Sequence, residues 1–300
     1  MSDDVALPAP LGLRRDATLS RAEPLSALQV VHVGHSAIVL GTPGRLVPVT
    51  GPDRWLVPGG LHVTSERDWA GLLDLARRTG ANGANGATVS CDAWLATAAP
   101  CDLTLPAPLP LPSPAAAEAA SAGARADALA TWSAASPPHA PASLDRARRP
   151  VLALAAAAVA DRYEPDAVRR LVGAGPGTTP TGDDLLVGML AGLLAGADRP
   201  RAHRLGATVL ELLHRTTRAS RHELAAAVDG RFGEALRDVV TTLTEPGATP
   251  DAVLRPAARL ATWGASSGRD QAHGAALAVS ALLATDSPSA CAAHPPQTTT

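Results

Sequence analysis

The chain has 300 residues and a formal net charge of −2, and its aromatic residues are five Trp, one Tyr and one Phe. This composition provides neither a broad basic face nor a base-stacking surface, so we exclude nucleic acid as a partner. The longest apolar runs, 151–160 and 185–197, are shorter than the roughly 18 to 20 residues that a membrane-spanning helix needs. The N-terminus MSDDVALPAP lacks the positive start and apolar stretch of a secretory signal, so we expect a cytoplasmic protein with no membrane partner.

The first third of the chain reads as β-structure. Residues 28–63 are rich in Val, Leu and Ile and are interrupted every few residues by Gly or Pro, which favours short strands with tight turns. The segment TPGR at 42–45 predicts a hairpin between strands at 36–40 and 46–49. Apolar positions at helical spacing predict one helix at 68–79, beside the sheet. We therefore expect a small β-rich domain, barrel-like or sandwich-like, over residues 1–104.

The remainder of the chain reads as helical, so the predicted fold class is α+β. Pro, Ala and Ser dominate residues 105–142, which are typical of a linker or a peripheral excursion around an Ala-rich stretch. Helical patterns then fill a domain at 143–285, and residues 286–300 read as a disordered tail. The predicted helices are 143–163, 165–172, 181–197, 200–217, 221–243, 250–263 and 267–284.

The most informative stretch is LVGAGPGTTPTGDDLLVGMLAGLLAG at 171–196, in which a loop of Gly, Pro and Thr leads into an apolar helix. Thr181 is predicted as the N-cap, and Asp183 and Asp184 in the first turn complete a pattern similar to a capping box. The glycines at 188, 192 and 196 recur every four residues, which predicts a helix face in close contact with another helix or strand. Capping and close packing alone would explain much of this motif.

Known nucleotide motifs do not account for the loop. The spacing from Gly177 to Gly182 matches a phosphate-binding P-loop, but Asp183 stands where that motif requires Lys, and the chain contains no Lys at all. A dinucleotide-binding loop is excluded as well, because Thr178 takes the position of its third glycine. Phosphate or carboxylate must therefore be held by Arg, hydroxyl groups or backbone N–H groups.

The sequence at this helix start is repeated later in the chain. Thr181, Gly182, Asp184 and Gly188 match Ser267, Gly268, Asp270 and Gly274 at identical offsets. Each set opens an Ala-rich apolar helix. Two such helices in one domain could converge, and we expect their positive N-terminal ends and the two carboxylates to meet around one cavity.

These features predict an anion site. We expect oxygens of phosphate or carboxylate to bind the N–H groups of the loop and of the two helix starts, together with nearby hydroxyls. The candidate anion-binding residues are Gly175, Gly177, Thr178, Thr179, Thr181, Gly182, Ser267 and Gly268. The candidate catalytic residues are Asp183, Asp184 and Asp270, which would orient an amide N–H2 or coordinate Mg²⁺, a candidate cofactor. Arg218 and Arg269 are candidates for anion contacts or for solvated surface charges, and the hydroxyls at 216, 217 and 220 read as a helix cap.

Three motifs in order, GAGPGTTPTGDDLLVGMLAG at 173–192, TTRAS at 216–220 and WGASSGRDQAHGAALA at 263–278, resemble the AllH family. The resemblance implies a subunit of oxamate carbamoyltransferase that acts with AllF-like and AllG-like partners in purine (allantoin) catabolism. It also implies small anionic ligands, namely carbamoyl phosphate, oxamate or oxalurate. The sequence departs from the family pattern at 264–268 and in the segment 105–142. Two alternatives remain, a non-catalytic ligand-binding or assembly subunit and a stand-alone Mg-dependent phosphate-handling enzyme.

Overall fold

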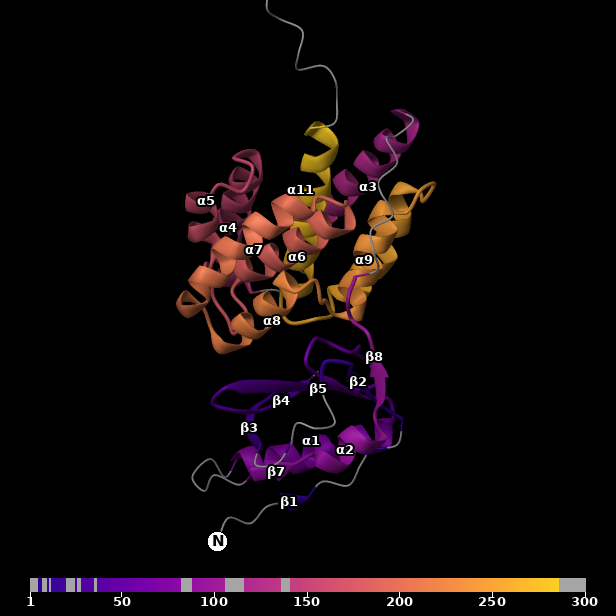
Figure 1. The fold of residues 1–300 in the computed structure, drawn as a ribbon, viewed down its shortest axis with the longest axis vertical. Coiled ribbons are helices and arrows are strands. Elements are labelled where there is room, and N and C mark those ends of the chain that lie inside the picture. The colour runs from indigo at the N-terminus through magenta and orange to yellow at the C-terminus, as the bar shows by residue number, and fades with distance from the viewer. Residues whose placement is uncertain are drawn as a thin grey trace, which may run out of the picture.

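The computed structural model describes residues 5–6, 10, 12–19, 25, 28–34, 37–81, 88–105, 116–135 and 141–285. A β-rich region comes first in the chain and a mainly helical region follows it, which confirms the expected α+β class (Figure 1). In the view of Figure 1 the sheet and its two helices form the lower half of the molecule and the long helices form the upper half. None of the helices in the described ranges has the length and hydropathy needed to cross a bilayer.

The strands of the described region form one mixed sheet with the order β1-β7-β3-β4-β5-β6-β2-β8. The pairs β1–β7, β5–β6 and β2–β8 are parallel and the other pairs are antiparallel. The strands are β1 (Val5–Ala6), β2 (Leu13–Asp16), β3 (Leu28–Val33), β4 (Ala37–Thr42), β5 (Arg45–Thr50), β6 (Leu61–Val63), β7 (Thr88–Ser90) and β8 (Ala99–Cys101). The predicted hairpin is confirmed, because β4 and β5 pair in antiparallel fashion up to Thr42 and Arg45.

Helix α1 (Glu66–Ala81) packs on the sheet, as the spacing of its apolar residues predicts. Its buried residues Trp69 and Leu72 share one core with strand residues such as Val47 and Leu61. The short helix α2 (Asp92–Thr97) adds Trp94 to the same core. This core belongs to the β-rich region alone.

The connection between β5 and β6 leaves the sheet and joins the helices. Trp55 and Val57 in this connection belong to the apolar core of the helical region. The backbone is tied to that region as well, because Leu56 N donates to Glu234 Oε2 at 3.1 Å and Glu234 N donates to Leu56 O at 3.2 Å. The connection therefore forms part of the junction between the two regions.

The helical region surrounds helix α6, whose residues from Thr181 to Leu193 are all buried. A helix that is apolar on every side must be enclosed by protein, and α6 contacts six neighbouring helices of the region. The helices are α3 (Ala116–Ala134), α4 (Ala142–Ala160), α5 (Pro165–Leu171), α6 (Thr181–Ala195), α7 (Arg199–Leu212), α8 (Arg218–Val228), α9 (Glu234–Thr244), α10 (Leu254–Leu260) and α11 (Ser267–Thr285). Short 3-10 turns, η1 (Leu213–Arg215) and η2 (Pro250–Val253), follow α7 and precede α10.

Two predicted helices were too long. The segment predicted as one helix at 221–243 is divided into α8 and α9, because Gly230 adopts a positive φ of 75° that ends a helix. The following residue, Arg231, forms a β-bridge with Thr104 instead of continuing the helix. Likewise, only the middle of the predicted helix 250–263 is α-helical, as α10.

Part of the segment 105–142 is packed against the helical region. Its Ala-rich part forms α3, which packs along α11 and buries Ala126 and Leu129 in the helical core. Arg125 fixes the helix in place, since its Nε donates to Leu243 O at 2.9 Å. The proposed domain boundaries stay a prediction, and the predicted tail 286–300 lies outside the described residues.

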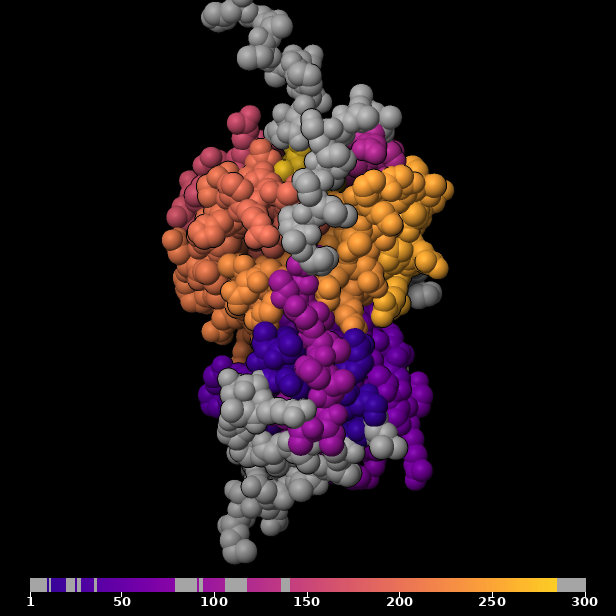
Figure 2. All heavy atoms as spheres, turned by 45° about the vertical axis from the view of Figure 1, so that its right-hand side comes forward, coloured from indigo at the N-terminus to yellow at the C-terminus, as the bar shows by residue number. Residues whose placement is uncertain are grey.

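Strand β8 leads the chain across the junction between the two regions. Figures 1 and 2 show this stretch, in magenta, rising from the sheet toward the helices. Phe232 N donates to Leu103 O and Leu105 N donates to Gly230 O, both at 3.1 Å. Arg14 of β2 also forms an ion pair with Glu234 of α9. The sheet is therefore held to the helices by main-chain and side-chain bonds.

Candidate functional site

Helices α6 and α11 pack with almost no space between their backbones. A Cβ atom on Gly188 would overlap Gln271 O, and one on Gly274 would overlap Leu185 O. A Cβ on Gly192 would lie 2.8 Å from Ala275 O. The predicted close contact is therefore confirmed for two of the three glycines at four-residue spacing, while Gly196 is the C-cap of α6.

The starts of the two helices also meet, as the internal sequence repeat predicts. Thr179 Oγ1 and Ser267 Oγ are 2.8 Å apart, which joins the glycine loop to the first residue of α11. One turn further, Gln271 Nε2 donates to Asp184 Oδ1 at 3.4 Å. Burial raises the pKa of Asp184 well above its ordinary value, and the nearby carboxyls of Glu223 and Asp270 add to this.

The capping prediction for Thr181 was wrong. Pro180 occupies the N-cap position, and Thr181 is the first residue of α6, with its hydroxyl buried and without a described partner. Gly182 N donates to Ala174 O at 2.8 Å, and Gly268 N donates to Trp263 O at 3.1 Å. The N–H groups of Gly182 and Gly268 are thus occupied by the protein and are not available to an anion.

Two of the candidate catalytic carboxylates have structural partners. Asp183 accepts a hydrogen bond from Gly173 N at 2.8 Å and another from the Thr216 hydroxyl, so it ties the glycine loop to the segment before α8. Asp270 forms an ion pair with Arg148, and both side chains are almost fully enclosed. Burial raises the pKa of each aspartate. A catalytic role for the three aspartates stays a prediction.

A cavity of about 630 Å³ opens beside the glycine loop, between the helix starts and the sheet. Of the predicted anion-binding residues, Gly177, Thr178, Thr179 and Ser267 line it, whereas the three aspartates do not. The other lining residues come from β3 to β5, the 54–58 connection, α4, α8 and the loop before α11; they include His32, Val39, Arg54, Pro58, Leu144, His222, Glu223 and Trp263. The wall of the cavity is therefore built from both regions of the chain.

The loop presents donors to this cavity. The N–H groups of Gly177, Thr178 and Thr179 make none of the hydrogen bonds found in the described part of the chain. Gly175 and Gly177 have φ values of 105° and 106°, a conformation that other residues rarely adopt. Thr217 caps α8 as expected, accepting from Ser220 N at 3.1 Å, and its hydroxyl also donates to Thr178 O at 2.5 Å. The loop is therefore held in an unusual shape by its surroundings.

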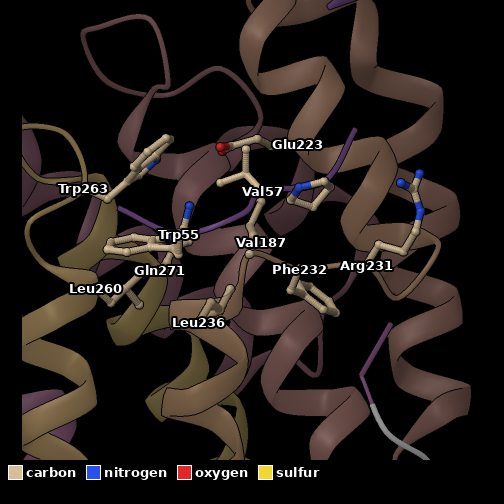
Figure 3. A pocket seen from close by; sticks show the side chains of 12 residues that line it. Trp55, Val57, Val187, Glu223, Arg231, Phe232, Leu236, Leu260, Trp263 and Gln271 are labelled. Atoms are coloured by element: carbon tan, nitrogen blue, oxygen red, sulfur yellow. The ribbon is translucent and has the colours of Figure 1, made fainter. Parts of the chain in front are cut away.

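A smaller cavity of about 30 Å³ adjoins the larger one, with which it shares Val57, Pro58, Glu223 and Trp263, and we refer to it as the inner end. Figure 3 shows Glu223 and Gln271 pointing into the space beside Trp263. The rings of Trp55 and Trp263 lie with their centroids 5.7 Å apart. The inner end is thus a mainly apolar space into which Glu223 and Gln271 project; Arg231 also lines it and forms ion pairs with Asp16 and Asp229.

Glu223 is a site residue that the sequence prediction missed. Burial raises its pKa to about 7, and the charge of Asp183 contributes. The helical spacing could have revealed it. Glu223 lies three residues after the buried Ser220 and four before the buried Ala227, which places it on the inner face of α8. A carboxyl group on the inner face of a helix usually affects the function or the stability of the protein.

The neighbouring His222 is held in one tautomer. Its Nε2 lies 2.8 Å from Pro58 O, and because a carbonyl can only accept, Nε2 carries the proton and Nδ1 is an acceptor. Burial lowers the pKa of His222, so the ring is neutral. The two candidate arginines bind protein groups: Arg218 Nη2 donates to Arg45 O at 2.9 Å, and Arg269 stacks on Trp132 at 4.1 Å from the ring centroid. Within the described ranges, no group of three His, Cys, Asp or Glu side chains is placed to hold a metal ion.

Comparison with known proteins identifies the part of the chain that carries this site. The model of one protein family, described as oxamate carbamoyltransferase subunit AllH, matches residues 171–279. Searches of the curated proteins and of the solved structures found no match. The matched residues include the glycine loop, α6, α8 and the first two-thirds of α11, so the chain is similar to this family over the loop and the helices beside it.

Proposed function

We propose that this chain is an AllH-like subunit of an oxamate carbamoyltransferase-type enzyme of purine (allantoin) catabolism, and that its cavity binds a small anionic carbamoyl compound. The ligands that fit this proposal are carbamoyl phosphate, oxamate and oxalurate. One observation carries it: the family match covers the residues that form the loop, and Gly177, Thr178 and Thr179 of that loop line a cavity of about 630 Å³ with N–H groups that make no hydrogen bond to the described residues.

The proposed anion contacts come from the backbone. Three consecutive loop residues, 177–179, offer N–H groups, and the exposed Thr178 adds a hydroxyl. Successive N–H groups in a loop with positive φ angles form a concave donor site for phosphate or carboxylate. Arg54 lines the same cavity and contributes positive charge. This arrangement needs no Lys, in agreement with the absence of that residue from the chain.

The aspartates have a different role in this proposal. Asp183 holds the loop through Gly173 and Thr216, and Asp270 holds α11 against Arg148. Because the residues that line the cavity include none of the three aspartates, the geometry also favours a second candidate. In that candidate the chain binds the ligand, and AllF-like and AllG-like subunits complete the chemistry.

The proposal is tested by calorimetric titration of the protein with phosphate, carbamoyl phosphate, oxamate and oxalurate. We expect saturable binding of at least one carbamoyl compound. Gly177→Ala should weaken that binding at least tenfold, because the loop cannot keep its φ of 106° with an alanine. Gly247→Ala is the matched control, since Gly247 also has a positive φ, of 76°, but lies in an open turn outside the cavity.

Two results would count against the proposal: no binding of any carbamoyl compound, or equal losses in the two glycine variants. Addition of AllF-like and AllG-like chains to the assay separates the two candidates. Carbamoyl transfer by the isolated chain supports a complete enzyme. Transfer that appears only in the mixture supports the ligand-binding subunit.

A further inference from the structure

Glu223 projects a carboxyl group into the inner end of the cavity. Its oxygens make no hydrogen bond or ion pair among the described residues, and the residue is half-buried. A charged group beside apolar side chains is costly unless it is hydrogen-bonded, so its position here calls for a partner. A ligand group that donates hydrogen bonds would provide one.

Gln271 complements Glu223 at the same place. Its Nε2 donates one hydrogen to Asp184 Oδ1, at 3.4 Å, and the amide nitrogen has a second hydrogen to donate. Figure 3 shows the nitrogen end of Gln271 directed toward the space that Glu223 faces. An acceptor and a donor thus line the same small cavity, which is the complement of an unsubstituted carboxamide with its N–H2 and C=O groups.

The surrounding apolar groups strengthen this selectivity. Trp55 and Trp263 form part of the wall, and Val187, Leu236 and Leu260 line it as well. Hydrogen bonds and charge repulsion are stronger in such a low-dielectric environment than in water. The inner cavity of about 30 Å³ has room for a water-sized group such as N–H2.

We infer that Glu223, assisted by Gln271, selects ligands that end in a carboxamide or carbamoyl group and rejects ligands that end in a second carboxylate. This inference rests on the proposed function, in which the loop at 177–179 holds the anionic end of the ligand. Replacing N–H2 by O⁻ removes the two hydrogens that Glu223 accepts and places a second negative charge against it. A site built to pair with N–H groups discriminates strongly against an analogue without them.

Oxamate and oxalate form a suitable pair of probes, because they differ only in the replacement of N–H2 by O⁻. Calorimetric titration at pH 8 should show that the wild-type chain binds oxamate at least tenfold more tightly than oxalate. The preference should decrease at pH 6, because Glu223, with a pKa of about 7, takes up a proton and can then donate to a carboxylate. In Glu223→Gln the preference should fall below threefold and should not change between the two pH values.

Two further variants make the result decisive. Glu223→Met keeps the size of the side chain and removes its acceptors and its charge, so it should lose affinity for oxamate and no longer repel oxalate, and the preference should decrease. Glu211→Gln, an exposed position on α7, should leave the oxamate preference unchanged. If both Glu223 variants still bind oxamate and keep the wild-type preference for oxamate over oxalate, the inference is overturned while the proposed function stands. If the wild-type chain binds no carbamoyl ligand of the panel, the proposed function fails, and the inference fails with it.

Discussion

Gly188 on α6 stands directly against the main-chain carbonyl of Gln271 on α11, so closely that even a methyl group would overlap it. Gly274 has the same relation to Leu185 in the opposite direction. Each helix therefore uses a glycine to accept the backbone of the other. The contact sets the separation of the two helix starts, and with it the position of Asp184 and Gln271 beside the cavity.

Gly188→Ala should destabilise the protein by about 3 kcal/mol or more, because the added methyl forces apart two helices in a packed core. Urea denaturation measures this loss. Gly123→Ala on α3 is the control: a Cβ there would meet only Leu283 Cδ1, at 3.9 Å, so the variant should be neutral or slightly more stable. Equal behaviour of the two variants would show that the helices can separate without cost.

Asp270→Asn should be strongly destabilising, because it leaves Arg148 enclosed without its counter-charge. Loss of one member of a buried ion pair typically costs about 3–5 kcal/mol. The midpoint of chemical denaturation is the measurement. Asp166→Asn removes the partner of Arg169 on the surface and should change the midpoint little, because the Asp166 side chain is 90% exposed. A small effect at Asp270 would instead favour the direct role in ligand chemistry that the sequence predicted.

Asp183→Ala should loosen the glycine loop. The change removes the acceptor for Gly173 N and for the Thr216 hydroxyl, and hydrogen bonds to a charged group contribute about 1.5–3 kcal/mol each. We expect both lower stability and weaker binding of the carbamoyl ligand. Thr216→Val, which removes only one of the two bonds, should give a smaller change in each measurement. Full ligand affinity in Asp183→Ala would show that the loop keeps its shape independently.

Glu223 should make the stability of the protein depend on pH. Its pKa lies at about 7 in the folded chain and at the ordinary value of 4.5 in the unfolded chain. Between these values the folded state binds more protons, so the free energy of unfolding from this group falls as pH rises from about 4.5 to 7. Melting temperatures from pH 5 to pH 8 should therefore show Glu223→Gln more stable than wild type above pH 7, with the advantage shrinking toward pH 5. A constant difference across this range would contradict the assignment.

Sequence reasoning found the packing of the site more readily than its polar partners. Glycines repeating every four residues have few explanations other than close helix contact, so the α6–α11 pair could be predicted. The N-cap of α6 could not, because the preference for Thr over Pro at that position is worth only about 1 kcal/mol and burial of Thr181 outweighs it. Glu223 escaped notice because Trp55 and Val57, which enclose it, are distant in sequence.

The sheet, too, could be predicted from the sequence only in part. Alternating apolar residues and the TPGR turn were enough to place β4 and β5, since a tight turn leaves adjacent strands only one way to pair. The sequence did not indicate that β2, near the N-terminus, lies between β6 and β8. Such pairing depends on contacts between residues far apart in the chain rather than on local pattern. The sequence therefore predicted only a barrel-like or sandwich-like domain, whereas the structure contains a single mixed sheet.

The connection that carries Trp55 out of the sheet has a consequence for ligand choice. Its residues lie outside the stretch 171–279 that matches the family, yet Arg54, Val57 and Pro58 face the same hollow as the glycine loop. Two chains could therefore share every motif of the helical half and still prefer different molecules, if this short excursion differed between them. Exchanging the excursion alone would be a direct way to redirect the preference while leaving the anion-holding loop intact.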